Sequence, residues 1–222
     1  MTGDTARLSP ADLPTALPIF PLQGALLLPG GELPLHIFEP RYRAMIEDAL
    51  LAERMIGMIQ PREKEKLQPD DKPSVFGIGC VGKITANSRL DDGRHLILLT
   101  GACRFRVRRE LPLLRGYRRV EPDYGPFVTD LYDDGGDVDR AQLVATLVKY
   151  LQRRKLEADW KAIEDTPTPK LVAIMAMVCP FTASEKQALM ESSDVAHRAR
   201  TMMTLMRMDA AAPPGDGPLL RN

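Results

Sequence analysis

The segment Gly77-Ile-Gly-Cys-Val-Gly-Lys83 has the spacing of a phosphate-binding loop. It matches Gly-x-Gly-x-x-Gly, the dinucleotide pattern, and most of the P-loop pattern, in which N–H groups at a helix N-terminus hold phosphate. Either loop must open a helix, but Ile84-Thr-Ala-Asn87 and a hairpin turn follow here. Ile84 also stands where a P-loop needs Ser or Thr for Mg²⁺. We therefore predict a strand whose glycines allow a bend or a close neighbour.

The histidines and serines form no pattern typical of a metal site or a hydrolase. His36, His95 and His197 are scattered, and no two have the spacing of metal ligands. The Gly-x-Ser-x-Gly context of many nucleophilic serines does not occur. We interpret His36 as a structural histidine in a strand and predict no catalytic residue, metal site or cofactor. A hydrolase with an unrecognised Ser-His-Asp site is kept as a minor alternative.

One arginine cluster could bind an acidic partner. Apolar and basic residues alternate from Cys103 to Arg108, so a strand would place three arginines, Arg104, Arg106 and Arg108, on one face. We expect a solvated face that nearby acids balance. The alternative is a contact surface for an acidic peptide or RNA.

Methionines gather near the C-terminus, where seven of the eleven lie between Met175 and Met208. Methionine fills irregular cores and also occurs on promiscuous binding surfaces. We favour core filling. However, Met202 and Met203 cannot share one helix face, so some thioethers should lie at the edge of the core or outside it. Met202, Met203 and Met206 are therefore candidates for a binding surface.

Composition limits the classes of partner. The 222 residues contain 30 Lys plus Arg and 30 Asp plus Glu, and 44% are hydrophobic. Zero net charge disfavours broad electrostatic capture of nucleic acid. Cys80, Cys103 and Cys179 show no Cys-x-x-Cys spacing and are interpreted as buried, reduced thiols. The N-terminus has no signal-peptide core, and no apolar run approaches the ~20 residues of a membrane span. We predict a cytoplasmic protein without a membrane partner.

The elements change character along the chain. Strand patterns dominate residues 16–132, beginning with the proline-broken run Leu17–Leu22, which suits an edge strand or a strand end. Pro40 suits the first turn of a helix, and Asp92-Gly93 suits a hairpin turn. Helical patterns dominate 133–208, with a capping box at Thr182 and Glu185 and a cap at Ser193. Residues 1–15 are expected to be a flexible lead and 209–222 a disordered tail. A charged loop is predicted over 61–73.

Three segments resemble the N-terminal, substrate-binding domain of Lon-type ATP-dependent proteases, over about residues 16–208. The first contains Pro18-Ile-Phe-Pro-Leu22, Pro29 and Leu35-His-Ile-Phe-Glu-Pro-Arg-Tyr42. The second pairs Gly79-Cys-Val-Gly-Lys83 with Thr100-Gly-Ala-Cys-Arg-Phe-Arg-Val107. The third is the helical end, 181–191 and 193–198. The resemblance implies an α+β protein, with a PUA-like β-barrel-type subdomain followed by a small helical bundle.

The resemblance also suggests a function. Too few residues follow 208 for an ATPase module, and no catalytic Ser-Lys module is found, so we expect no proteolysis by this chain. We expect a non-enzymatic module that recognises unfolded or tagged polypeptides, with a protease as a further partner. The alternative, from another class, is an RNA-binding protein that uses the PUA-like fold and the arginine face.

Overall fold

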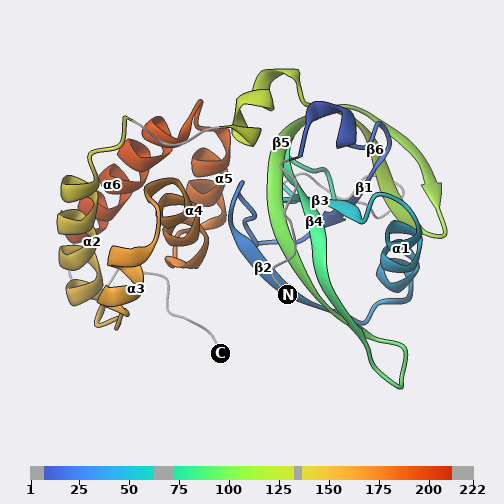
Figure 1. Cartoon of the computed structure of the whole chain (residues 1–222), viewed down its shortest axis with the longest axis horizontal. Helices are drawn as coiled ribbons and strands as arrows, with labels where there is room; N and C mark the ends of the chain where they lie inside the picture. Colours follow the sequence, from blue (N-terminus) through green and yellow to red (C-terminus); the bar gives the residue numbers. More distant parts are fainter. Residues whose placement is uncertain (1–7, 63–72, 133–136, 212–222) are drawn as a thin grey trace. The chain divides into compact units, whose positions relative to one another are not determined.

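The computed structural model describes residues 8–62, 73–132 and 137–211, and the chain divides into two compact units. Met1–Tyr132 form the first, here called the barrel unit, and Asp133–Asn222 form the second, the helical unit. All strands of the described residues belong to the barrel unit (Figure 1). The predicted α+β class is confirmed.

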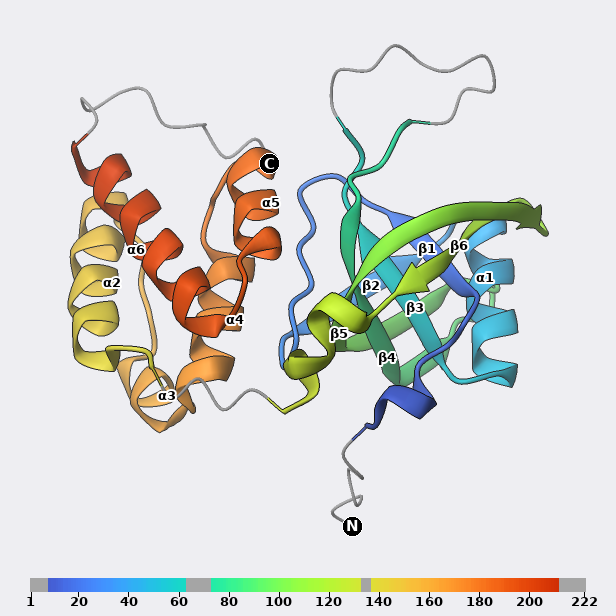
Figure 2. The same ribbon diagram turned by 90° about the horizontal axis from the view of Figure 1, so that it is seen from above.

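The barrel unit is built on one six-stranded sheet. Its strands are β1 (Leu17–Pro21), β2 (Glu32–Ile37), β3 (Met55–Ile59), β4 (Ile78–Arg89), β5 (His95–Leu114) and β6 (Tyr117–Asp123). Their order is β2-β5-β4-β3-β1-β6, and a further pairing of β5 with β6 closes a ring of five strands. The long, curved β5 makes this closure possible, because its first part pairs with β2 and β4 and its last part with β6 (Figure 2).

β1 lies inside the sheet, so the edge-strand alternative is wrong, while Pro21 stands at the end of the strand, in line with the other alternative. It pairs with β6 over 17–19 and with β3 over 19–21. Leu22 N–H donates to Ile59 O at 3.1 Å, which places the N atoms of even-numbered residues on the β3 side. The nitrogen of Pro18 therefore points toward β3, at a position before the pairing with β3 begins. The nitrogen of Pro21 points toward β6, at a position after the pairing with β6 has ended. The two missing N–H groups cost no ladder hydrogen bond.

The barrel interior requires glycine at its tightest points. Leu17, Ile19, Val81 and Phe105 are among its fully buried residues. A Cβ on Gly79 would lie 2.5 Å from Met58 O and 2.8 Å from Phe105 Cζ. β4 runs through the glycine-rich segment, which confirms the predicted strand and a close neighbour as the reason for glycine.

Helix α1 (Pro40–Leu51) packs against β1, β3 and β6, with Pro40 in its first turn as predicted (Figures 1 and 2). Asp48 fixes it to the β5–β6 hairpin by accepting hydrogen bonds from Tyr117 Oη at 2.9 Å and Arg115 Nη1 at 2.6 Å. The described part of the barrel unit also contains two 3₁₀ segments, η1 (Pro10–Asp12) and η2 (Gly125–Leu131). Leu13, within the predicted flexible lead, belongs to the barrel core, whereas Pro10, Ala11, Asp12 and Thr15 are exposed.

The helical unit contains α2 (Arg140–Arg154), α3 (Trp160–Asp165), α4 (Thr168–Val178), α5 (Ala183–Glu191) and α6 (Val195–Ala211). α2 and α6 lie side by side (Figures 1 and 2). The capping box of Thr182 and Glu185 is confirmed. The sequence did not predict the short α3, and α6 continues past the predicted boundary at 208. Of the predicted loop and tail, 63–72 and 212–222 lie outside the described residues.

No helix in the described ranges combines the length and the apolar character needed to cross a membrane.

Candidate functional site

Arg104 does not belong to an exposed arginine face, so that prediction is wrong for this residue. Its side chain is fully buried, and Nε and Nη2 each donate to a carboxylate oxygen of Asp130 at 2.8 Å. Its guanidinium also lies 4.7 Å from the centre of the Phe127 ring. The alternation along β5 is real, but η2 packs against the strand here and its Asp130 and Phe127 cover Arg104. A residue facing away from the barrel interior is therefore covered as well.

Most neighbouring arginines are paired with acids. Arg109 Nε lies 2.7 Å from Glu121 and Arg108 Nη2 lies 3.5 Å from Asp123. Further pairs join Arg115 to Glu47 and Asp48, and Arg118 to Glu110. Arg106 is exposed and has no ion pair among the described residues. This arrangement agrees with the balanced, solvated face and does not favour a stripe that binds RNA phosphates.

The candidate methionines are core residues, which agrees with the favoured core filling, so these three do not form an exposed binding surface. Met202 is 0% exposed, Met203 4% and Met206 1%. α6 contacts α2, α4 and α5, so methionines on different faces of the helix are all covered. Met206 also lines a pocket of about 380 Å³ together with Thr146, Lys149 and Arg207. Met208 is the exposed methionine of this helix, at 64%.

Ser193, Asp194 and His197 come together, but they form a helix cap. Asp194 Oδ1 accepts from His197 N–H at 2.6 Å, and Asp194 Oδ2 accepts from Ser193 Oγ at 2.7 Å. These bonds, the backbone one first, lower the pKa of Asp194. His197 Nδ1 lies 3.2 Å from Ser193 Oγ. A Ser-His-Asp triad needs the carboxylate on the histidine ring, whereas here it binds the serine and the helix backbone. Asp194 thus caps α6, not Ser193 as predicted.

The other titratable side chains suggest no metal centre. Within residues 8–62, 73–132 and 137–211, no three His, Cys, Asp or Glu side chains gather in an arrangement that could hold a metal ion. His36, predicted to be a structural strand residue, is exposed on β2, and its ring meets Phe38 edge-on at 6.0 Å.

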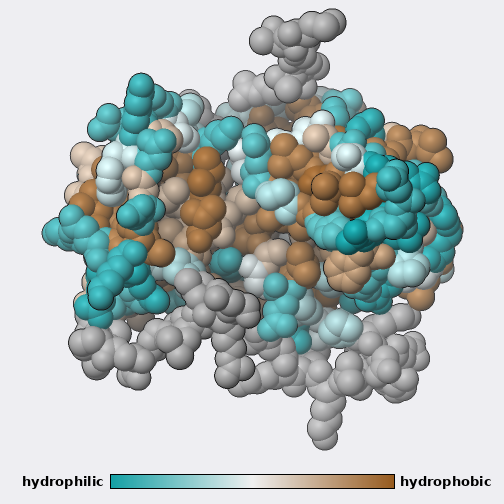
Figure 3. All heavy atoms as spheres, turned by 90° about the horizontal axis from the view of Figure 1, so that it is seen from below, coloured by the Kyte–Doolittle hydropathy of each residue, from teal (hydrophilic) through white to brown (hydrophobic). Residues whose placement is uncertain are grey.

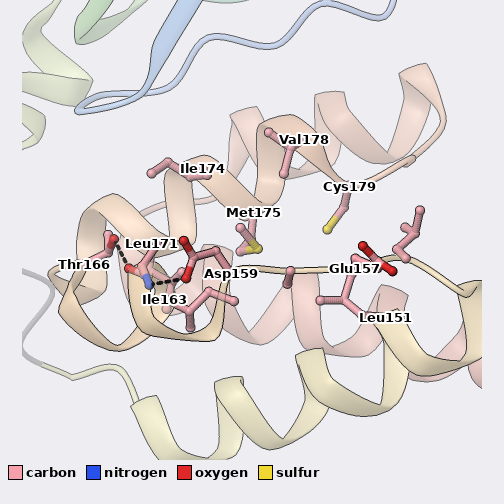
Figure 4. Close-up of a pocket in the computed structure, with 13 residues that line it drawn as sticks. Leu151, Glu157, Asp159, Ile163, Thr166, Leu171, Ile174, Met175, Val178 and Cys179 are labelled. Carbon is pink, nitrogen blue, oxygen red and sulfur yellow. Dashed lines mark hydrogen bonds between the residues drawn. The ribbon is translucent and has the colours of Figure 1, made fainter.

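The helical unit contains an apolar pocket of about 400 Å³ between the end of α2, the segment 155–159, α3 and α4 (Figure 4). Its walls include Leu171, 1% exposed, and Cys179, 3% exposed. In Figure 4 the sulfur atoms of Met175 and Cys179 lie on the side of α4 that faces Glu157 and Asp159. The lining residues are Leu151, Leu156, Glu157, Ala158, Asp159, Ala162, Ile163, Thr166, Leu171, Ile174, Met175, Val178 and Cys179.

Large apolar side chains at this pocket reach solvent. Val178 is 65% exposed and Leu156 37%. The nearby Trp160, the first residue of α3, is 41% exposed. Figure 3, which shows one face of the molecule, shows brown apolar surface among polar side chains on both units. The pocket has the size of ligand sites, which range from ~300 to ~1,000 Å³ and are mostly apolar with a few polar groups.

Local structure explains how the pocket forms. Asp159 Oδ1 accepts from Ala162 N–H at 3.0 Å and starts α3, and Lys155 ends α2 with a positive φ of 53°. These two caps fix both ends of the segment between them, which forms one wall of the pocket. Burial raises the pKa of the Cys179 thiol to about 12. Sequence reasoning missed the pocket; the one signal for it was the apolar character of all sides of α4, from Leu171 to Val178.

Comparisons with known proteins identify the family. The ATP-dependent protease La (LON) substrate-binding domain matches residues 16–208. The chain is 26% identical over 215 residues to a Lon protease of Anaeromyxobacter dehalogenans, covering 92% of this chain and 24% of that protein. It is 26% identical over 205 residues to Lon protease 2 of Myxococcus xanthus, covering 88% and 24%. The chain thus spans about a quarter of the length of these relatives.

Solved structures share the fold. A Lon N-terminal domain protein from Xanthomonas campestris superposes with a TM-score of 0.59 at 22% identity, over 90% of this chain and 99% of that one. The N-terminal domain of a Lon protease from the Mycobacterium avium complex gives 0.62 at 19% identity, over 86% and 98%. The family match covers both the barrel unit and the helical unit, and the chain belongs to the Lon substrate-binding domain family.

Proposed function

We propose that this chain is a non-enzymatic module that binds exposed segments of unfolded or tagged polypeptides and presents them to a separate protease. Membership of a family described as a substrate-binding domain supports the recognition of polypeptides. The single structural observation that carries the proposal is the apolar pocket of the helical unit, whose mouth exposes Val178 to solvent. Exposed apolar surface beside a cavity is typical of interaction sites.

The pocket suits one bulky apolar side chain of an extended or unfolded segment. Burying such a side chain contributes about 1.5–3 kcal/mol. Ordering the flexible segment opposes binding, so a single contact should be weak, with a Kd of about 1 mM or weaker. Weak contacts of this kind suit a module that must recognise many sequences and release them again.

The test compares two exposed apolar residues of the helical unit. Val178 lies at the pocket and Met208 does not line it, and their exposures are 65% and 64%. We expect Val178→Gln to weaken the binding of a fluorescein-labelled, permanently unfolded polypeptide at least about threefold. Met208→Gln, the matched control, should leave the Kd unchanged. Fluorescence anisotropy at low and at physiological salt gives both values.

Salt separates this proposal from the RNA alternative. Apolar capture should survive physiological salt, whereas binding through phosphates falls steeply with added salt. The same titration with a single-stranded RNA therefore serves as a comparison. Salt-sensitive RNA binding without polypeptide binding would overturn the proposal, and so would equal losses in the Val178 and Met208 variants.

A further inference from the structure

We propose that the pocket selects segments in which a bulky apolar residue stands next to a lysine or arginine, an inference that rests on the proposed function. The reason is the charge of the lining. Of the 13 lining residues, two are charged, Glu157 and Asp159, and both are acidic. The remaining lining is apolar apart from Thr166 and Cys179.

The Glu157 carboxylate is available to a ligand. It is exposed, and no described residue hydrogen-bonds or pairs with it. Figure 4 shows it beside Leu151 and Cys179, at the edge of the apolar walls. In a bound segment, the residue whose cationic side chain reaches Glu157 is therefore next in sequence to the residue whose apolar side chain fills the pocket.

Asp159 adds a second negative charge in a fixed position. Its Oδ1 accepts from Ala162 N–H at 3.0 Å, which holds the carboxylate at the start of α3. Its Oδ2 makes no hydrogen bond to a described residue and stays open to a ligand. The cap partly offsets the charge of Asp159, so Glu157 carries most of the expected selectivity.

Among the described residues, no lysine or arginine lines the pocket. Lys186 on α5 lies close enough to Cys179 to lower the pKa of that thiol against the larger effect of burial, but Lys186 does not line the pocket. Lys155 and Lys161 are exposed and are not lining residues either. The aliphatic stem of a ligand lysine or arginine can lie on the apolar rim while its charge reaches Glu157.

Three labelled peptides test the selectivity. Each has one Phe in a Gly/Ser background, flanked by Lys, by Gln or by Glu. Wild type should bind the Lys peptide about two- to fivefold more tightly than the Glu peptide at low salt, the range of an exposed ion pair. Glu157→Gln should remove most of this ratio. Asp137→Asn removes an exposed acid of the same unit that does not line the pocket, and should keep the ratio.

The outcomes separate the two proposals. A Lys preference that disappears only in Glu157→Gln supports the inference. Equal binding of the three peptides, or a preference that Glu157→Gln leaves unchanged, overturns the inference while the proposed function stands. If neither the peptides nor the unfolded polypeptide binds, the proposed function is wrong and the inference falls with it. Far-UV circular dichroism of each variant confirms that it is folded.

Discussion

Arg104 and Asp130 form a buried, two-pronged ion pair that ties strand β5 to the 3₁₀ segment η2. Their side chains are 1% and 4% exposed, and the backbone N–H of Arg104 also donates to Asp130 Oδ2, at 3.0 Å. The pair is therefore a structural joint of the barrel unit. This position removes Arg104 from any surface that could read RNA or an acidic peptide.

Removing one partner of this ion pair should destabilise the barrel unit strongly. Asp130→Ala leaves the Arg104 guanidinium buried without its partner, and we expect the free energy of unfolding to fall by about 3–5 kcal/mol. Arg109→Ala removes an arginine whose side chain is 70% exposed, and should cost no more than about 1 kcal/mol. Urea unfolding followed by far-UV circular dichroism measures both. Equal, small losses in the two variants would contradict the structural role of the pair.

The glycine-rich segment offers a matched comparison within one motif. A Cβ on Gly79 would meet the Met58 backbone oxygen, whereas a Cβ on Gly77 would meet nothing within 4 Å. Because a backbone atom cannot rotate away, Gly79→Ala should destabilise the barrel unit by about 1–3 kcal/mol. Gly77→Ala should stay within about 0.5 kcal/mol of wild type. Similar urea midpoints for the two variants would show that close packing does not explain Gly79.

Local signals predicted local structure well. Pro40 at the start of α1 and the Thr182–Glu185 capping box are set by residues a few positions apart, and both are confirmed. Gly93 takes the positive φ expected of the hairpin turn, at 79°. The PUA-like resemblance led to a barrel-type sheet, and the long β5 closes it. The positions of Pro40, the capping box and Gly93 depend on backbone preferences that a short window of sequence contains, whereas the barrel-type sheet was predicted from the resemblance alone.

Features that depend on distant partners were not predictable from the sequence. Asp130 lies 26 residues after Arg104, so nothing near Arg104 indicated its burial. The pocket needs α2, α3 and α4 to meet, and the six-residue α3 is too short to show a helical period. Met202, Met203 and Met206 are buried because α6 contacts three other helices of its unit. Periodicity reports which side a residue faces, but not what covers that side.

The cap of α6 makes a pH-dependent prediction. Hydrogen bonds from the helix backbone and from Ser193 lower the pKa of Asp194 below its unfolded value. A lowered carboxyl pKa stabilises the fold above the unfolded pKa, and this stabilisation disappears as the pH falls from about 4 through the folded pKa. At pH 7, Asp194→Ala should cost about 1 kcal/mol.

Asparagine separates the charge of this cap from its geometry. Asp194→Asn keeps a side-chain oxygen for the helix N–H but carries no titrating charge. The stability difference between wild type and Asp194→Asn should therefore shrink as the pH is lowered from 6 to 3. Trp160, the single tryptophan, lies in the helical unit and reports its unfolding by fluorescence. A difference that stays constant over this range would mean that the ionised carboxylate does not act on the helix.

The Cys179 thiol gives the opposite pH dependence at the pocket wall. Burial raises its pKa to about 12, so the folded chain keeps it protonated where the unfolded chain, with a pKa of about 8.5, loses the proton. The stabilisation is complete below the unfolded pKa and is lost as the pH rises above it. Between pH 8 and pH 10.5 we expect this thiol alone to reduce the free energy of unfolding on the order of 2 kcal/mol.

Cys179→Ala provides the comparison, because it removes the titrating thiol. Tyr150, another buried titratable group of the helical unit, is present in both proteins. The variant should be less stable than wild type at pH 8, since the substitution leaves a small void. That difference should narrow at pH 10.5, where wild type loses the contribution of the thiol. Trp160 fluorescence in urea follows both proteins at both pH values. If the difference does not narrow, the thiol is not held protonated at alkaline pH, and the wall of the pocket around Cys179 admits water.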